Sequence, residues 1–154
     1  QEKLSKENTG FVGVAGTRHF TKNAVWWDME QWKGGSHSGV VLHGNSIYDM
    51  EATLFGNMGE VVVMDGVFLA AKVKTLNLIQ LTKPNFFNGL WDFYDIFYTF
   101  QTYRKGLKNY TLPIQIRHES FGELAGRESW HLNKEAFANY FKKELPAIVK
   151  RPHP

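Results

Sequence analysis

The segment from Glu60 to Ala71 constrains the fold of this chain more than any other stretch of its sequence. It runs E-V-V-V-M-D-G-V-F-L-A-A, with apolar and β-branched residues on both sides of Asp65-Gly66. This composition predicts a β-strand over residues 60–71. A polar, flexible break inside an apolar strand often marks a bulge or a functional site. A simple turn between two strands is the equally weighted alternative.

Other segments predict an α/β fold around this strand. Residues 11–15, 39–43 and 112–118 are apolar or alternate in polarity, and we expect them to join residues 60–71 in one mixed sheet. Glycines in the first of these segments suit places where backbones pass closely. We expect residues 17–38 to form an irregular but ordered loop, because three tryptophans argue against disorder.

Two helices are predicted to pack on this sheet. Residues 92–105 repeat phenylalanine at helical spacing, and Gly106 follows them as a C-terminal cap. Asn133 suits the N-cap of a second helix over residues 134–145, which Pro146 would end. The fold class is therefore expected to be α/β, with a mixed sheet flanked by helices in a single domain.

The composition fits one globular domain. The chain has 154 residues, 43% hydrophobic and 21% charged, so that a sizeable core can form and disorder is not expected. Aromatic residues make up 15%, which serves either a large core or a site that stacks flat rings. The absence of cysteine excludes disulfides and thiolate metal sites.

The charge pattern excludes an ordinary nucleic-acid binder. The net charge is only +3, and the basic residues are scattered from Lys3 to Arg151 without forming a stripe. Weak attraction to an anionic membrane surface is left open, although a solvated face explains the lysines better. No apolar run reaches the roughly 20 residues of a membrane span, and the first residues do not resemble a signal peptide. We expect a cytoplasmic location and, since the chain begins with Gln1, a fragment of a longer protein.

Three ionisable residues occupy the ends of predicted elements. Asp65 interrupts a strand, Asp95 lies in the first turn of a helix, and His118 ends a strand. Side chains at such junctions can converge on a cleft beside a sheet edge. The helix dipole at Asp95 predicts that the pKa of its carboxyl group stays low.

Each candidate also has a purely structural interpretation. Asp95 taken alone is more often a helix-dipole partner, and a lone histidine such as His118 more often makes a local hydrogen bond. Trp26-Trp27 is more often core than a ligand platform, and His43 is expected to be structural. The sequence has no nucleophile elbow, phosphate-binding Walker loop or zinc-binding His-Glu-x-x-His pair.

The order of three sequence blocks resembles a bacterial glycosyltransferase-like family related to the family-two glycosyltransferases. The second and third blocks are fairly specific as a pair, because their order and separation both match. The blocks span most of residues 10–122 and are Gly10-Phe11-Val12-Gly13-Val14-Ala15-Gly16 followed by Trp26-Trp27, Glu60 to Ala70, and Phe93-Tyr94-Asp95-Ile96 running to Ile116-Arg117-His118-Glu119-Ser120.

The resemblance implies a GT-A fold and an inverting transfer of sugar from a nucleotide-sugar donor to a saccharide or lipid-linked acceptor. It places Asp95 as the general base, and it places His118 at the metal, expected to be manganese or magnesium, or at the diphosphate. The substrate-binding residues that it implies are Asp65, Gly66, Trp26, Trp27, Tyr94 and Glu119.

Two departures from the family pattern stand out. The second acid of the family's helix motif is replaced by Phe97, and this affects acceptor positioning more than the base. The sequence also contains no Asp-x-Asp motif. We therefore expect only the acceptor-side, C-terminal portion of a catalytic domain, without the nucleotide-binding half and inactive when isolated.

Two rival functions remain. A non-catalytic carbohydrate-binding or interaction module could keep the cleft and its aromatic residues while lacking the donor site. A metal-dependent hydrolase using His118, Asp95 and Asp65 ranks lower, because the recurrent histidine pairs of such sites are missing.

Overall fold

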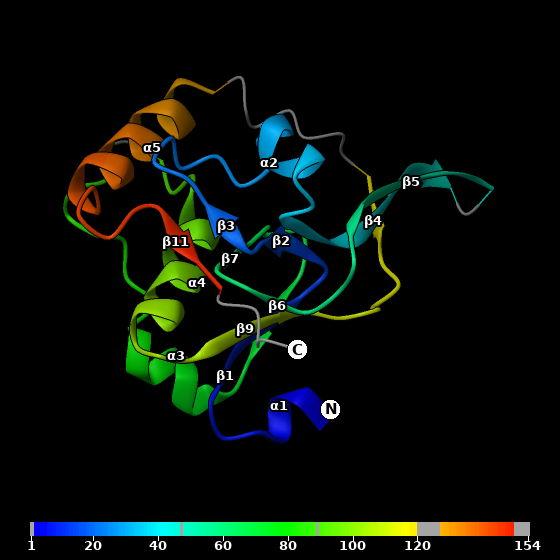
Figure 1. Cartoon of the computed structure of the whole chain (residues 1–154), viewed down its shortest axis with the longest axis horizontal. Coiled ribbons are helices and arrows are strands. Elements are labelled where there is room, and N and C mark those ends of the chain that lie inside the picture. The colour runs from blue at the N-terminus through cyan, green and yellow to red at the C-terminus, as the bar shows by residue number, and fades with distance from the viewer. Residues whose placement is uncertain (1, 47, 89, 120–126, 150–154) are drawn as a thin grey trace.

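The computed structural model describes residues 2–46, 48–88, 90–119 and 127–149. Ser120 and Arg151, considered above, lie outside these ranges. The chain forms an α/β fold, as predicted, with short strands preceding and separating its helices (Figure 1). The helices are α1 Glu2–Ser5, α2 Met29–Lys33, α3 Val73–Ile79, α4 Tyr94–Arg104 and α5 Glu128–Tyr140. The strands are β1 Thr9–Gly13, β2 Ala15–Thr17, β3 His19–Phe20, β4 His37–Ser46, β5 Asp49–Gly56, β6 Glu60–Val61, β7 Val63–Met64, β8 Leu69–Ala71, β9 Lys108–Thr111, β10 Arg117–His118 and β11 Ala147–Ile148.

The strands form three sheets, so the expectation of one sheet is wrong. The first sheet has the order β6-β9-β1-β8, and the second has the order β10-β4-β2-β7 with β5 paired to β4. Strands β11 and β3 form a third, two-stranded sheet. Pairing in the first two sheets is mixed, as predicted: β1 is parallel to β9, and β4 is parallel to β10, while their other neighbours are antiparallel.

The chain passes from the first sheet to the second at two apolar residues. Val14 separates β1 from β2, and Val62 separates β6 from β7; both valines are fully buried. Their backbone groups are still paired, since the amide of Val62 donates to the carbonyl of Thr17 at 2.8 Å. Gly16 permits this crossing, because a Cβ atom there would lie 2.3 Å from the carbonyl oxygen of Val63. The predicted strands 11–15 and 60–71 are therefore broken by switches between sheets.

Helix α4 packs its apolar face on the sheets and ends as the sequence predicts. Gly106 has a φ of 76°, and its amide donates to the carbonyl of Tyr103 at 2.9 Å, while the amide of Leu107 donates to Thr102 at 3.0 Å. This pair of bonds is the Schellman arrangement, in which glycine avoids the strain of a left-handed residue.

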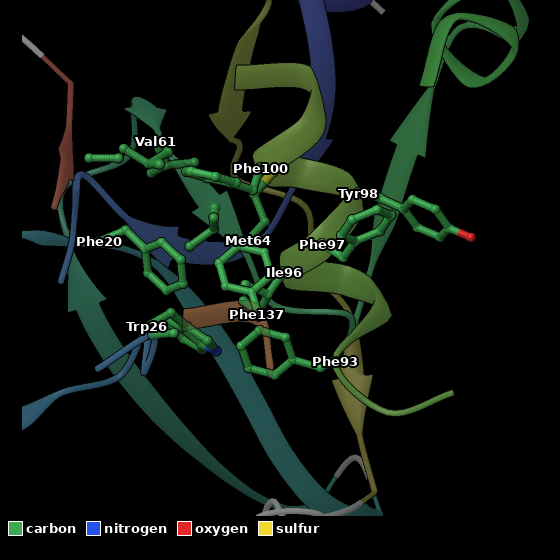
Figure 2. Packing of buried hydrophobic residues seen from close by; sticks show 14 of the residues in the cluster. Phe20, Trp26, Val61, Met64, Phe93, Ile96, Phe97, Tyr98, Phe100 and Phe137 are labelled. Carbon is green, nitrogen blue, oxygen red and sulfur yellow. The ribbon is translucent and has the colours of Figure 1, made fainter. Parts of the chain in front are cut away.

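Three fully buried phenylalanine rings form the centre of the core. Phe100 of α4 lies 5.2 Å from Phe137 of α5, and both lie within about 6 Å of Phe20 of β3, measured between ring centroids. Figure 2 shows these rings beside Met64, with Phe97 and Tyr98 on the other side of α4. Figure 1 shows α3, α4 and α5 on one side of the sheets, with the β4–β5 ribbon extending away from the other side.

The last predicted helix begins earlier than expected. Helix α5 starts at Glu128, so Asn133 is an interior, fully buried residue and not an N-cap. Its side-chain amide donates to the carbonyls of Leu90 and Asp92, both at 2.9 Å. These tertiary bonds, which no local pattern reveals, hold the segment before α4 against α5.

The predicted strand over 112–118 is also wrong in its extent. Only Arg117–His118 pairs with β4, and residues 112–116 are irregular. Strand β9 lies just before them and belongs to the first sheet, whereas β10 belongs to the second. The chain therefore changes sheets again within residues 112–116. Within the described residues, no helix combines the length and apolar character needed to cross a bilayer.

Candidate functional site

A cavity of about 570 Å³ lies where the second sheet meets the N-terminal ends of α4 and α5. This volume is in the range of sites that bind small molecules. Its wall is mostly aromatic and aliphatic, with carboxyl and imidazole groups set into it. The lining residues are Trp26, Trp27, Met29, Trp32, Val41, His43, Thr53, Phe55, Asp65, Gly66, Val67, Asp92, Phe93, Tyr94, Asp95, His118 and Trp130.

Asp65 enters the cavity because the chain leaves β7 at this residue. Its backbone amide still donates to the carbonyl of Ala15 at 3.0 Å, so that the main chain is anchored to the sheet. One carboxylate oxygen accepts the amide of Val67 at 2.9 Å, and the other accepts the indole N–H of Trp26 at 3.2 Å. Two donors from different segments therefore fix the carboxylate in one orientation.

Asp95 is held beside Asp65 by the backbone of the intervening glycine. The amide of Gly66 donates to Oδ2 of Asp95 at 2.8 Å, and the amide of Ile96 donates to Oδ1 at 2.8 Å. A Cβ atom on Gly66 would lie 2.8 Å from the hydroxyl of Tyr94 and 3.1 Å from Cβ of Asp95. A residue without a side chain is needed at this contact, which supplies a physical reason for the Asp-Gly pair.

The environment raises the pKa of both carboxyl groups. Burial raises the pKa of Asp95 to about 7, and the neighbouring charge of Asp65 adds to this, while the amides of Ile96 and Gly66 act in the opposite direction. Burial also raises the pKa of Asp65, opposed by the Val67 amide, the charge of His118 and the Trp26 indole. The expectation of a low pKa at Asp95 is wrong, because desolvation outweighs the helix dipole.

His43 and His118 face each other across the parallel pair of strands β4 and β10. They are register partners, and their ring centroids are 5.5 Å apart. The Nδ1 atom of His118 is buried and has no hydrogen-bond partner among the described residues. His43, expected to be structural, thus lies on the cavity wall beside the residue that the sequence did single out.

The cavity therefore collects Asp65, Asp95 and His118, three residues widely separated in the sequence. Against this geometry, a profile of a glycosyltransferase-like family matches residues 4–141. The chain belongs to this glycosyltransferase-like family. The match covers every residue of the cavity wall. No curated protein and no solved structure matches the chain.

Membership of a glycosyltransferase family makes glycosyl transfer the general chemistry to consider for the cavity. Besides Asp65, Asp95 and His118, four of the predicted substrate-binding residues line its wall: Gly66, Trp26, Trp27 and Tyr94. Trp26 is only 4% exposed and serves mainly as a hydrogen-bond donor to Asp65, whereas Trp27 is half-buried. The individual roles of these residues stay predictions.

Two residues of the glycosyltransferase motifs lie away from the cavity wall. Glu119 is exposed, and its carboxylate pairs with the guanidinium of Arg117 at 2.5 Å. Phe97, which replaces the family's second acid, is buried 5.6 Å from Phe87, measured between ring centroids, and belongs to the core. In this glycosyltransferase-like chain the carboxyl group beside Asp95 is that of Asp65, which follows β7, and not that of a residue of α4.

Sequence reasoning missed much of the wall. The tilted rings of Trp32 and Phe55 lie 5.4 Å apart, and Trp130 lies 5.3 Å from Trp27, again between centroids. Phe55 belongs to β5, a strand that was not predicted, and Trp130 belongs to the first turn of α5, which was predicted to start later. A signal did exist for the site as a whole, since four of the five tryptophans line this cavity.

The glycosyltransferase resemblance implies a divalent metal, but a complete set of ligands for it is not present among the described residues. Within the described residues, no group of three or more His, Asp or Glu side chains is arranged to hold a metal ion. Manganese and magnesium also prefer oxygen ligands, whereas His43 and His118 offer nitrogen. The role of His118 at a metal or at the diphosphate stays a prediction.

Proposed function

We propose that this chain is the acceptor-side part of a GT-A glycosyltransferase, in which Asp95 is the general base. The observation that supports this most is the raised pKa, about 7, of a carboxyl group on the wall of a cavity of substrate size. A base is most effective when its pKa lies near the working pH, where it is both ionised and able to hold a proton.

The proposed reaction joins an acceptor hydroxyl to the sugar of a nucleotide-sugar donor. The hydroxyl oxygen forms a bond to the anomeric carbon, and the bond from that carbon to the diphosphate oxygen breaks. The electron pair leaves with the nucleoside diphosphate, and the proton passes to a carboxylate oxygen of Asp95. Attack from the face opposite the leaving group inverts the anomeric centre.

The hydrogen bonds of Asp95 are compatible with this role. Each oxygen accepts one backbone amide, from Gly66 or Ile96, and a carboxylate oxygen has two lone pairs. One lone pair on each oxygen therefore stays available to an acceptor hydroxyl. The two amides hold the carboxylate before the substrate binds, which lowers the reorganisation that the reaction requires.

Asp65 is proposed to contact the substrate and to tune the base. Its charge raises the pKa of Asp95, so ionisation of one carboxyl group makes the other a stronger base. Tyr94 completes this end of the cavity, and the pKa of its hydroxyl is raised by burial and by the charges of Asp95 and Asp65. Its hydroxyl is thus a neutral hydrogen-bond partner for a sugar hydroxyl at physiological pH.

The decisive experiment replaces Asp95 by asparagine in the full natural protein that contains this chain. We expect sugar transfer to fall by about 100- to 10,000-fold, the usual loss when a general base is removed. Asp49→Asn, on exposed strand β5, is the control and should keep its activity. Transfer is followed by release of nucleoside diphosphate across a panel of nucleotide sugars. A loss in Asp65→Asn with no loss in Asp95→Asn would reassign the base.

A nucleotide-binding part outside these residues is proposed to supply the donor site. Binding and orientation of the donor contribute much of the rate of such a reaction. The 154-residue chain purified alone is therefore expected to turn over no nucleotide sugar. Measurable turnover by that chain would contradict the assignment to the acceptor side only.

A non-catalytic carbohydrate-binding module is the second candidate, and the aromatic wall favours it. Trp27 and Trp32 are half-buried at the cavity, and flat rings of this kind stack on sugar faces. This alternative predicts saccharide binding by the natural protein with no nucleoside diphosphate released, and no dependence of binding on the charge of Asp95.

A further inference from the structure

We infer that the acceptor bound in this cavity is an uncharged hydroxyl compound carrying a compact apolar group, preferably an aromatic ring. This inference rests on the proposed function and specifies its substrate class. It follows from the arrangement of polar and apolar side chains on the cavity wall. The polar side chains and the apolar side chains come mainly from different segments of the fold.

The reactive end of the cavity contains the polar groups. Asp65, Asp95 and Tyr94 converge on Gly66, as the contacts of this glycine show. His118 of β10 also acts on this end, since its charge lowers the pKa of Asp65. An acceptor hydroxyl would have to lie at this end to reach a base.

Most of the rest of the wall is apolar, although His43, Thr53 and Asp92 also line it. Its tryptophan rings and Phe55 come from α2 and the segment before it, from β5 and from α5. The ring of Trp32 in α2 lies 5.4 Å from that of Phe55 in β5, and the ring of Trp27 lies 5.3 Å from that of Trp130 in α5, measured between centroids. Trp26 connects the two pairs, with its ring centroid 5.0 Å from Phe55 and 5.9 Å from Trp27. The result is one continuous aromatic wall that begins at the indole bonded to Asp65.

This wall keeps apolar surface that the protein itself does not cover. Trp27, Trp32 and Phe55 are only half-buried, and Met29 of α2 is 58% exposed at the same cavity. Apolar surface gathered in a concave site gains most when an apolar ligand removes it from water.

The charge of the wall indicates that the acceptor is uncharged. Asp65, Asp92 and Asp95 place three carboxyl groups on it, and no lysine or arginine is found among the described residues that line it. A phosphorylated acceptor would meet like charge, and the guanidinium of Arg127 near this wall lies 3.8 Å from Asp92 and pairs with that carboxylate. The volume, about 570 Å³, also suits a sugar with one ring attached.

Calorimetric titration of the natural protein with matched glycosides tests this inference. Methyl and phenyl β-glycosides of glucose, galactose, mannose and N-acetylglucosamine give pairs that differ only in the apolar group. For at least one sugar we expect the phenyl glycoside to bind about tenfold or more tightly than its methyl partner. Phenyl phosphate should bind more weakly than that phenyl glycoside.

Two wall variants and one control locate the effect. Trp27→Ala should reduce the phenyl preference to less than about threefold, and Met29→Glu should do the same without removing a core ring. Trp91→Phe is the control, because Trp91 packs against Tyr98 and does not line the cavity. The inference would be overturned if methyl and phenyl glycosides bound equally, or if neither bound. It would also be overturned if Met29→Glu and a folded Trp27→Ala both kept the full phenyl preference.

The outcome can be separated from that of the proposed function. The phenyl preference is expected to persist in Asp95→Asn, since this substitution leaves the aromatic wall unchanged. A transfer reaction that depends on Asp95 but shows no phenyl preference would leave the function standing and refute the apolar acceptor. A phenyl preference without any transfer reaction would leave the apolar ligand standing and refute the proposed transfer function.

Discussion

Two neighbouring clusters of polar side chains are linked through Thr99 but differ in chemistry. The Asn109 network, made of Asn109, Thr99 and Thr102, lies between β9 and α4 and is fully buried. The carboxylate pair, Asp65 and Asp95, lies on the cavity wall. Thr99 joins them, because its carbonyl accepts from Asn109 while its hydroxyl donates to the carbonyl of Asp95 at 2.7 Å.

The Asn109 network is neutral and complete. The side-chain oxygen of Asn109 accepts the amide of Phe11 at 2.9 Å and the hydroxyl of Thr102 at 2.7 Å. Its side-chain nitrogen donates to the carbonyls of Val62 and Thr99 at 2.9 and 2.8 Å. One side chain thereby ties β1, the switch residue Val62 and α4 together, exactly where short strands change sheets.

The carboxylate pair is equally well hydrogen-bonded, but burial disfavours the ionised form of each carboxyl group. Each oxygen has a donor, yet burial raises the pKa of both groups. The comparison teaches that satisfied hydrogen bonds do not make a buried ionisable group a structural one. Both oxygens of each carboxylate accept an N–H, and a neutral amide has only one acceptor oxygen. The raised pKa values show that burial still disfavours the charged form, so the carboxyl groups are better explained by function than by stability.

The largest expected effect is a loss of stability when the Asn109 network is removed. Asn109→Ala removes the side-chain partner of the Phe11 amide and of the Val62 carbonyl, and it removes one of the partners of the Thr102 hydroxyl and the Thr99 carbonyl, which also bond to each other. Each unsatisfied buried group costs about 1–3 kcal/mol, and water can rescue some of them. We expect the free energy of unfolding to fall by about 3–5 kcal/mol in urea titrations. A loss below about 1 kcal/mol would show that the network contributes little.

The second prediction tests the close contact that places the carboxylate pair. A Cβ atom in Gly66→Ala would lie 2.8 Å from the hydroxyl of Tyr94 and 3.2 Å from Oδ2 of Asp95. Overpacking of this kind costs about 1–3 kcal/mol, and we expect about 2 kcal/mol by thermal unfolding. Adding Tyr94→Phe removes the closest atom and should restore part of the loss. If the double variant is no more stable than Gly66→Ala, the clash is not with this hydroxyl.

The third prediction uses the raised pKa of Asp95. Its folded-state pKa of about 7 lies above the ordinary value of 3.8, so the folded protein binds the extra proton between these values. Stability from this group is present below about pH 4 and is lost as the pH rises toward 7. Asp95→Asn lacks the titration, and its stability relative to the native protein should therefore increase with pH across this window.

The expected gain between pH 4 and 8 is about 1–2 kcal/mol, less than the full shift would give, because water reaches the cavity and screens the charge. Melting temperatures measured in parallel at each pH provide the comparison. Asp49→Asn controls for the overall change in net charge. A difference between Asp95→Asn and the native protein that is the same at all pH values would refute the raised pKa.

The sequence was sufficient for features that depend on local chemistry. Gly106 ended α4 as predicted, because a left-handed residue after a helix needs no tertiary information. The α/β class followed from periodicity, and the Asp65 break was visible as a polar interruption of an apolar run. The family resemblance, carried by blocks with matching order and spacing, is confirmed by the profile match over residues 4–141.

Features that depend on distant partners could not be predicted. The strand over 60–71 is divided because Val62 bonds to Thr17, and this pairing becomes visible only once β2 is placed. Asn133 has the composition of an N-cap, yet it bonds to carbonyls more than 40 residues away in sequence. The helix dipole suggested a low pKa for Asp95, whereas the burial that raises it comes from the whole fold.

The smallest expected effect concerns Glu119, which the sequence grouped with the site and the structure places at the surface. Its side chain is 70% exposed, and its only described ion pair is with Arg117. An exposed pair of this kind contributes about 0–1 kcal/mol, because water and salt screen it and both side chains lose freedom. Glu119→Gln should therefore change the free energy of unfolding by less than about 0.5 kcal/mol in urea titrations.

The same substitution sharpens the contrast with the carboxylate pair. Glu119→Gln and Asp95→Asn each remove one carboxyl charge, and both parent residues lie beside an element end. If charge near the site were sufficient for function, both variants would lose sugar transfer. If the raised pKa and cavity position of Asp95 are what matter, transfer by the natural protein should stay within about twofold in Glu119→Gln, since a surface substitution seldom disturbs a buried site. A tenfold loss in Glu119→Gln, with its stability unchanged, would return Glu119 to the substrate-binding residues and show that the acceptor extends beyond the cavity.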